Sequence, residues 1–262
     1  MHVFSLFILL ILFSIEFCVK QGLIPTIEML FPTVKHRYCV KHIYSNFKAN
    51  HKGLELKDAL WRCVEAITIR EFERRMQELK DLDPKAWEYL ININPTQWSK
   101  SHFTSKALSD CLANNLSKSF NFMILKARDK PILATLEWIR VRLMTKLYKK
   151  RRGIEKYVGR VCPNIQDKLE KLKLESITFC ATPSSRFMYE VDNDRERHVV
   201  NLTNRTCNYK IWDLTELPCK HGIAAIFKNL EKVEDYVHPC YLRETYLRTY
   251  QEIIQLMLGQ LE

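Results

Sequence analysis

Apolar side chains recur at intervals of three and four residues along most of the first 175 positions of the chain. This spacing places them on one face of a helix, because a helix turns once every 3.6 residues. Proline and polar capping residues mark several of the expected starts. The pattern predicts a short strand over 37–40 and helices over 22–31, 41–47, 54–66, 69–79, 84–91, 109–126, 131–151 and 163–173.

Two of these helices carry explicit start signals. Thr68 precedes Glu71 by three residues, which is the spacing of a capping box. Asp83 followed by Pro84 is typical of an N-cap and the first position of a helix. The expected inward residues are Ile69, Phe72, Met76 and Leu79 in the helix over 69–79, and Leu133, Leu136, Ile139, Leu143 and Leu147 in the longest helix, over 131–151.

Beyond residue 175 the pattern changes to short apolar runs separated by turn residues, which is typical of strands. Strands are expected over 178–180, 186–191 and 198–202, followed by a helix over 223–230. The fold class is therefore α+β and mainly α. We expect a helical part up to residue 175, a small ββα module over 176–232 and a helical tail over 233–262.

The chain is basic, with 41 lysines and arginines against 30 aspartates and glutamates and a net charge of +11. This excess favours a polyanionic partner such as nucleic acid through long-range attraction, although many basic domains have no such partner. Its nine cysteines are odd in number and scattered. They indicate reduced thiols in an intracellular protein rather than a disulfide framework.

Residues 1–21 form a separate apolar segment. Its apolar run, 3–15, is shorter than the roughly 20 residues that span a membrane and has the length of a signal-peptide core. No lysine or arginine precedes this run, and no Ala-x-Ala-like cleavage site follows it. Three interpretations stay open: a weak secretory signal, a peripheral membrane anchor, or an artefact of the gene model.

Three soft metal ligands, Cys207, Cys219 and His221, lie within fifteen residues of one another. Zinc binds thiolates and imidazoles in tetrahedral geometry, so a short loop closed by Cys-x-His is a candidate zinc half-site. A closed structural zinc site has four ligands, and this run supplies three.

The same run resembles the SWIM zinc finger of plant Mutator-like element (MULE) transposases, whose pattern is Cys-x-Cys, a spacer and Cys-x-His. Cys207, Trp212, Cys219 and His221 fall on that pattern, and the second cysteine of the family falls on Tyr209. The resemblance extends from about residue 22 onward, through 22–25, 36–42, 46–47, 127–131, 136–139, 235–241 and 244–247. It implies a truncated ribonuclease-H-like transposase domain over 22–175 and a degenerate SWIM finger over 176–232.

The resemblance also implies that the chain is not an enzyme. Mutator-like transposases cut DNA with three carboxylates that hold two metal ions. The first is expected upstream of this chain, the second falls on Cys18, and the third falls on Lys118. A lysine repels Mg²⁺, which needs oxygen ligands, so we expect no nuclease activity. Cys39 and His42 match another signature of the family, and either pack in the core or form a metal half-site.

The substitution at Tyr209 bears directly on zinc. A phenol with a pKa of about 10 is a poor structural ligand. Zinc binding on Cys207, Cys219 and His221 is expected to be weakened, because each ligand contributes to the free energy that also folds such modules. Water or another side chain would complete the site, or the module is a metal-free relic. The candidate substitutes are His198, His238 and Cys240.

Basic side chains gather at the end of the predicted helix over 131–151. A phosphate-binding patch there would bind DNA without sequence preference and with strong salt dependence. The run 149–152 is also typical of a nuclear-import signal. The alternative is a solvated face that complements the helix dipole. The candidate DNA-contacting residues are Lys146, Lys149, Lys150, Arg151 and Arg152.

Together, these features predict a transposon-derived, catalytically inactive nuclear protein that binds zinc and, weakly, DNA. A second hypothesis is a protein-interaction module that dimerises with itself or with a full-length transposase relative, through apolar surface left by the missing strands. A third is a relic without activity. A fourth, which requires that the apolar N-terminus is a signal, is a protein of the secretory pathway or membrane. No small-molecule substrate is expected.

Overall fold

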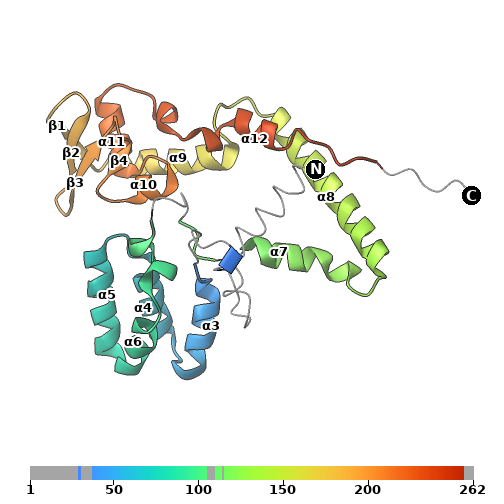
Figure 1. Cartoon of the computed structure of the whole chain (residues 1–262). Coiled ribbons are helices and arrows are strands. Elements are labelled where there is room, and N and C mark those ends of the chain that lie inside the picture. Colours follow the sequence, from blue (N-terminus) through green and yellow to red (C-terminus); the bar gives the residue numbers. More distant parts are fainter. Residues whose placement is uncertain (1–28, 31–36, 105–109, 114, 257–262) are drawn as a thin grey trace, which may run out of the picture.

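The computed structural model describes residues 29–30, 37–104, 110–113 and 115–256 (Figure 1). Over these residues the chain is α+β and mainly helical, as the sequence predicted, with a four-stranded antiparallel sheet. The expectations for residues 1–28 and 31–36, including Cys18, lie outside this range. The main helices are α3 (Val40–Asn50), α4 (Leu54–Glu65), α5 (Ile69–Leu82), α6 (Pro84–Ile91), α7 (Asn115–Ile124), α8 (Ile132–Glu155), α9 (Pro163–Ser176), α10 (Ile211–Thr215), α11 (Lys220–Lys228) and α12 (Arg243–Thr249).

Helices α3 to α6 form a body of their own, and both predicted start signals are confirmed there (Figure 1). The hydroxyl of Thr68 accepts a hydrogen bond from the backbone N–H of Glu71 at 3.2 Å, and the Glu71 carboxylate reaches back to the N–H of Ile67. The Asp83 carboxylate accepts hydrogen bonds from two N–H groups in the first turn of α6. These contacts satisfy donors that a helix leaves unpaired at its start.

The core of this body is apolar. Leu60 and Trp98 are fully buried in it, and the indole N–H of Trp98 donates to the carbonyl of Ile93 at 3.0 Å. The prediction that Ile69 faces inward is wrong, because about half of that residue is exposed at the first turn of α5. The buried members of the core, which we call the body core, are Val40, Ile43, Phe47, Ala59, Leu60, Cys63, Val64, Ala66, Phe72, Met76, Leu79, Ala86, Leu90 and Trp98.

Two predicted boundaries are also wrong. Residues 37–39 have no strand partner among the described residues, and α3 begins at Val40. The backbone N–H of Tyr38 bonds instead to the carbonyl of Gln97, and that of Val40 to the carbonyl of Leu112. The helix expected to begin at Ser109 begins at Asn115, because residues 110–113 run as a non-helical connection.

The longest helix, α8, begins after Pro131 as predicted and runs on to Glu155. It lies apart from the body, where it contacts α12 and the 3₁₀ turn Leu125–Ala127 that joins it to α7 (Figure 1). Leu143 is buried, but Leu133 is 78% exposed and Leu136 is 55% exposed, so the prediction that these two face a core is wrong. The helical pattern creates an apolar stripe. The 3₁₀ turn Leu125–Ala127 packs against the start of α8, but it leaves Leu133 and Leu136 exposed.

The remaining elements form a second unit around the sheet, which we call the module. The strands are β1 (Cys180–Pro183), β2 (Met188–Asp192), β3 (Arg197–Asn201) and β4 (Thr206–Cys207), and each pairs with the next in the chain. The predicted ββα arrangement therefore becomes four strands with α9 and α11 packed together beside them (Figure 1). The short strand β4 matters most for the site, because it pairs Cys207 with Val200.

The module has a hydrophobic core separate from the body core. Leu169 of α9, Val191 of β2, Val200 of β3 and Ile223 of α11 are all fully buried in it. Trp212 of α10 lies in the same core. Helix α9, which ends at Ser176 and so lies in the part of the chain expected to belong to the helical domain, thus contributes to the packing of the sheet.

The C-terminal segment is only partly helical. Two short 3₁₀ turns, Val233–Tyr236 and Pro239–Tyr241, lead into α12, and residues 251–256 are not helical. An isolated antiparallel bridge joins Val161 to Leu242. In the part of the chain that the structure describes, no helix combines the length and apolar character needed to cross a membrane.

Candidate metal centre

Two elements carry the candidate ligands. Cys207 ends β4, Cys219 caps the start of α11, and His221 lies two residues later in its first turn. The Cys219 sulfur accepts a hydrogen bond from the N–H of Gly222 at 3.5 Å. A Cβ atom at Gly222 would come within 2.5 Å of the Trp212 ring, so glycine lets α11 approach α10 closely. Packing of a helix start against a strand end therefore positions the three ligands.

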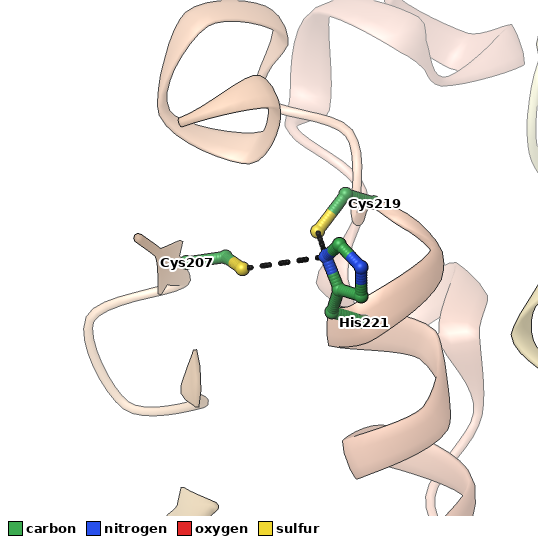
Figure 2. A group of neighbouring side chains, drawn as sticks. All are labelled: Cys207, Cys219 and His221. Atoms are coloured by element: carbon green, nitrogen blue, oxygen red, sulfur yellow. Dashed lines mark hydrogen bonds between the residues drawn. The ribbon is translucent and has the colours of Figure 1, made fainter. Parts of the chain in front are cut away.

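The three side chains converge in the module core (Figure 2). The Nδ1 atom of His221 lies 3.9 Å from the sulfur of Cys207 and 3.9 Å from the sulfur of Cys219. All three donor atoms lie within 4.8 Å of one another. With Zn–S and Zn–N bonds of about 2.3 and 2.0 Å, a tetrahedral site places sulfur and nitrogen about 3.5 Å apart. The arrangement is therefore close to that of a metal-bound set and could hold a metal ion.

The two cysteines are electrostatically coupled. The pKa of the Cys219 thiol is lowered, because Cys207 donates a hydrogen bond to its sulfur and His221 and the N–H of Gly222 add to the effect. The pKa of Cys207 is raised by that same hydrogen bond and by burial. Cys219 is therefore the first of the pair to become a thiolate, the form that binds metal.

Tyr209 borders the group without joining it. Its ring meets the His221 ring edge to face, with 4.8 Å between the centroids. Burial raises the pKa of its phenol, so it stays protonated at neutral pH and does not act as an anionic ligand. The aromatic side chain thus fills space beside His221 where the resemblance places a cysteine.

The substitute ligands expected from the sequence are not part of this group. His198 stacks on the His221 ring, with centroids 3.9 Å apart and planes at 26°. Cys240 is exposed, and its backbone N–H donates to Nδ1 of His238. Of the described residues, the group around Cys207 gains no fourth histidine, cysteine or carboxylate within 4.8 Å.

A second group of possible ligands shares His221 and was not anticipated from the sequence. It consists of Glu196, His198 and His221. The pKa of Glu196 is raised by burial but lowered more strongly by hydrogen bonds from Lys220 and His198, and falls to about 2. The sequence signal available was that 196 lies two residues before 198, although Glu196 itself precedes β3 and is not part of a strand. That signal does not identify His221 as their neighbour.

The predicted DNA-contacting residues divide between two sides of α8. Lys146, Lys149 and Lys150 are exposed and lie within one helical turn of one another. Arg151 pairs with Glu155 at 2.9 Å. Its guanidinium also reaches the carbonyl of Gln251. Arg152 lies 3.7 Å from the same glutamate. The structure therefore brings the three lysines together and directs Arg151 elsewhere.

Two further sequence motifs can be placed. Cys39 is fully buried at the N-cap of α3. Neither it nor His42 belongs to a group of three candidate metal ligands among the described residues. Lys118 falls within α7, but its side chain lies outside the described ones.

Comparisons with known proteins do not identify a family or a function for this site. No family model matches the chain, and neither a curated protein nor a solved structure matches it.

Proposed function

We propose that the module is a zinc-binding unit of the SWIM type, in a transposon-derived protein without catalytic activity. The observation that carries this proposal is the convergence of two sulfurs, each 3.9 Å from the same imidazole nitrogen, inside a hydrophobic core. Two thiolates and an imidazole favour zinc over the hard cations Mg²⁺ and Ca²⁺. A bound ion would cross-link the end of β4 to the start of α11.

We infer a structural rather than a catalytic role for the metal. Cys207, Cys219 and His221 are at most 3% exposed, so a substrate has little access to the ion. Catalytic zinc sites keep an open position for water or substrate. Here the ring of Tyr209 lies beside His221. The resemblance to the transposases places Cys18 and Lys118 at two positions where those enzymes have catalytic carboxylates. This supports the absence of nuclease activity.

The test is the zinc content of the full chain purified under reducing conditions. We expect one zinc ion per chain, and loss of that zinc in Cys219→Ser. The matched control is Cys180→Ser, which removes an exposed cysteine from the same module. Tyr209→Cys is expected to tighten zinc binding by restoring a fourth ligand. Zinc-free wild-type protein, with zinc bound only by the Tyr209→Cys variant, would show that the site is a relic.

A second candidate function, nucleic-acid binding, is favoured by the lysines of α8. Lys146, Lys149 and Lys150 are exposed, and no carboxylate of the described residues pairs with them. Arg142 lies one turn earlier and is also exposed. Four cations along one side of a helix favour contact with a phosphate backbone.

This candidate is tested by the salt dependence of binding to double-stranded DNA. Replacing the three lysines with glutamine is expected to weaken binding uniformly across sequences. The slope of log K against log salt should fall by about 2–3, because each phosphate contact contributes about 0.9. The control variant replaces the exposed Lys48, Lys52 and Lys85 of the body. Equal slopes for both variants would exclude α8 as the contact.

A further inference from the structure

His221 presents its two ring nitrogens to two different environments. Nδ1 faces the two sulfurs at 3.9 Å. Nε2 lies 3.6 Å from a carboxylate oxygen of Glu196. The ring is fully buried, and Nε2 has no hydrogen-bond partner among the described residues. A buried N–H without a partner is costly, so the nearest acceptor, Glu196, is the group expected to satisfy it.

We propose that Glu196 is the outer-shell carboxylate of the metal centre, which accepts a hydrogen bond from Nε2–H of His221 and so presents Nδ1 to the metal. The inference rests on the proposed zinc binding. The proton position of a metal-bound histidine is set by the hydrogen bond that its other nitrogen makes, and a carboxylate partner also raises the basicity of the ligand. Closure of a 3.6 Å gap to hydrogen-bond distance needs a shift of only a few tenths of an ångström.

Glu196 is held in place for this role. The ammonium group of Lys220 lies 2.9 Å from Oε1, and Nε2 of His198 lies 3.2 Å from Oε2. The other nitrogen of His198 is hydrogen-bonded to the side chain of Asn208 at 2.9 Å. The carboxylate is therefore fixed on both oxygens before any metal binds, as a positioning residue must be.

The same contacts argue against a second metal ion between Glu196, His198 and His221. The rings of the two histidines are stacked, with planes at 26°. Nitrogen lone pairs lie in the ring plane, so those of two stacked rings run side by side and do not converge on one ion. The Lys220 ammonium at 2.9 Å from Glu196 would also repel a cation there. The three residues therefore support the metal centre rather than form another.

The experiment measures zinc affinity of the full chain by competition with a chromophoric chelator. Glu196→Ala is expected to weaken binding by about 10–100-fold, which is typical for loss of an outer-shell partner. Glu196→Gln keeps an acceptor oxygen and is expected to fall between wild type and Glu196→Ala. The control is Glu190→Gln, an exposed carboxylate on β2 whose charge pairs with Arg197 at 3.4 Å.

A second readout is the protonation state of His221 in the zinc-loaded chain, read from its imidazole nitrogen shifts by NMR. We expect Nδ1 bound to metal and Nε2 protonated. Zinc coordinated through Nε2, or equal affinities for Glu196→Ala and Glu190→Gln in folded protein, would overturn the role of Glu196. Wild-type protein without zinc would instead overturn the metal site itself, so the two failures are distinguishable.

Discussion

The body core and the module core differ in the kinds of side chain that they bury. The body core is almost wholly apolar. The two buried hydroxyls beside it, those of Ser99 and Ser101, are bonded to each other, and Ser99 also donates to the carbonyl of Cys63. The module core encloses Cys207, Cys219 and His221, and the buried nitrogens of Trp212 and His221 have no partner among the described residues. The body has one such atom among the described residues, Nε of Arg75, but the guanidinium to which it belongs is paired through Nη1 with Glu78. The body can therefore be stable by packing alone. The module buries two thiols and an imidazole at one point, where a bound metal ion would pair all three groups.

Removal of metal is expected to give the largest difference in stability between the module and the body. In zinc-finger peptides the metal contributes about 10–16 kcal/mol, and the binding free energy is also folding free energy. We expect a zinc chelator to abolish amide protection in β2, β3 and α11 while α4 and α5 keep theirs. Hydrogen exchange with peptide-level mass spectrometry measures both regions in one sample. Unchanged protection of α11 would mean that the module folds without metal.

The body core is tested by a matched pair of leucines in α4. Leu60 is fully buried, whereas Leu54 is 76% exposed. Leu60→Ala should lower the free energy of unfolding of the body by about 2–5 kcal/mol, because it removes packed methyl groups and leaves a cavity. Leu54→Ala should change it by less than about 0.5 kcal/mol. Denaturant unfolding followed by hydrogen exchange in α4 checks both, and similar effects would contradict the assigned burial.

Two glycines, Gly222 in the module and Gly153 in α8, test how tightly the metal site is packed. Gly222→Ala places a methyl group 2.5 Å from the Trp212 ring, next to the ligand His221. We expect a loss of about 1–3 kcal/mol from overpacking, together with weaker zinc binding. Gly153→Ala in α8 meets nothing within 4 Å. It should stabilise that helix by about 0.5–1 kcal/mol. Thermal melts of the zinc-loaded variants give the sign of each change.

The smallest effect is expected at a helix cap of the body. Asp83→Ala removes the acceptor for the N–H groups of Lys85 and Ala86. Loss of an N-cap costs about 1 kcal/mol. The control, Asp81→Ala, removes an exposed carboxylate near the end of α5. If both variants unfold at the same denaturant concentration as wild type, the cap contributes nothing to stability.

Local signals in the sequence predicted the local features well. The caps at Thr68 and Asp83 and the starts of α8 and α9 depend on neighbouring residues, and all are confirmed. The number of strands was underestimated, because β4 has only two residues and exists through its pairing with β3. A two-residue strand leaves no periodic pattern to detect.

Periodicity also failed to show which apolar faces are covered. Leu133 and Leu136 have the spacing of core residues but are exposed in α8. Their exposure agrees with the expected oligomerisation, which stays a prediction. At the metal centre, the convergence of Cys207, Cys219 and His221 followed from spacing, whereas the approach of Glu196 depends on a long-range fold of β3 against α11.

The short separation of the three metal ligands also has a consequence for the order of folding. Cys207, Cys219 and His221 lie within one stretch of fifteen residues, whereas the core around them joins Val161 to Val237. Loops of about ten residues close in roughly 10–100 ns, far faster than distant segments assemble. A metal ion can therefore join the end of β4 to the start of α11 while the rest of the sheet is unformed. Zinc present during synthesis would then act on the rate of folding as well as on the stability of the folded chain.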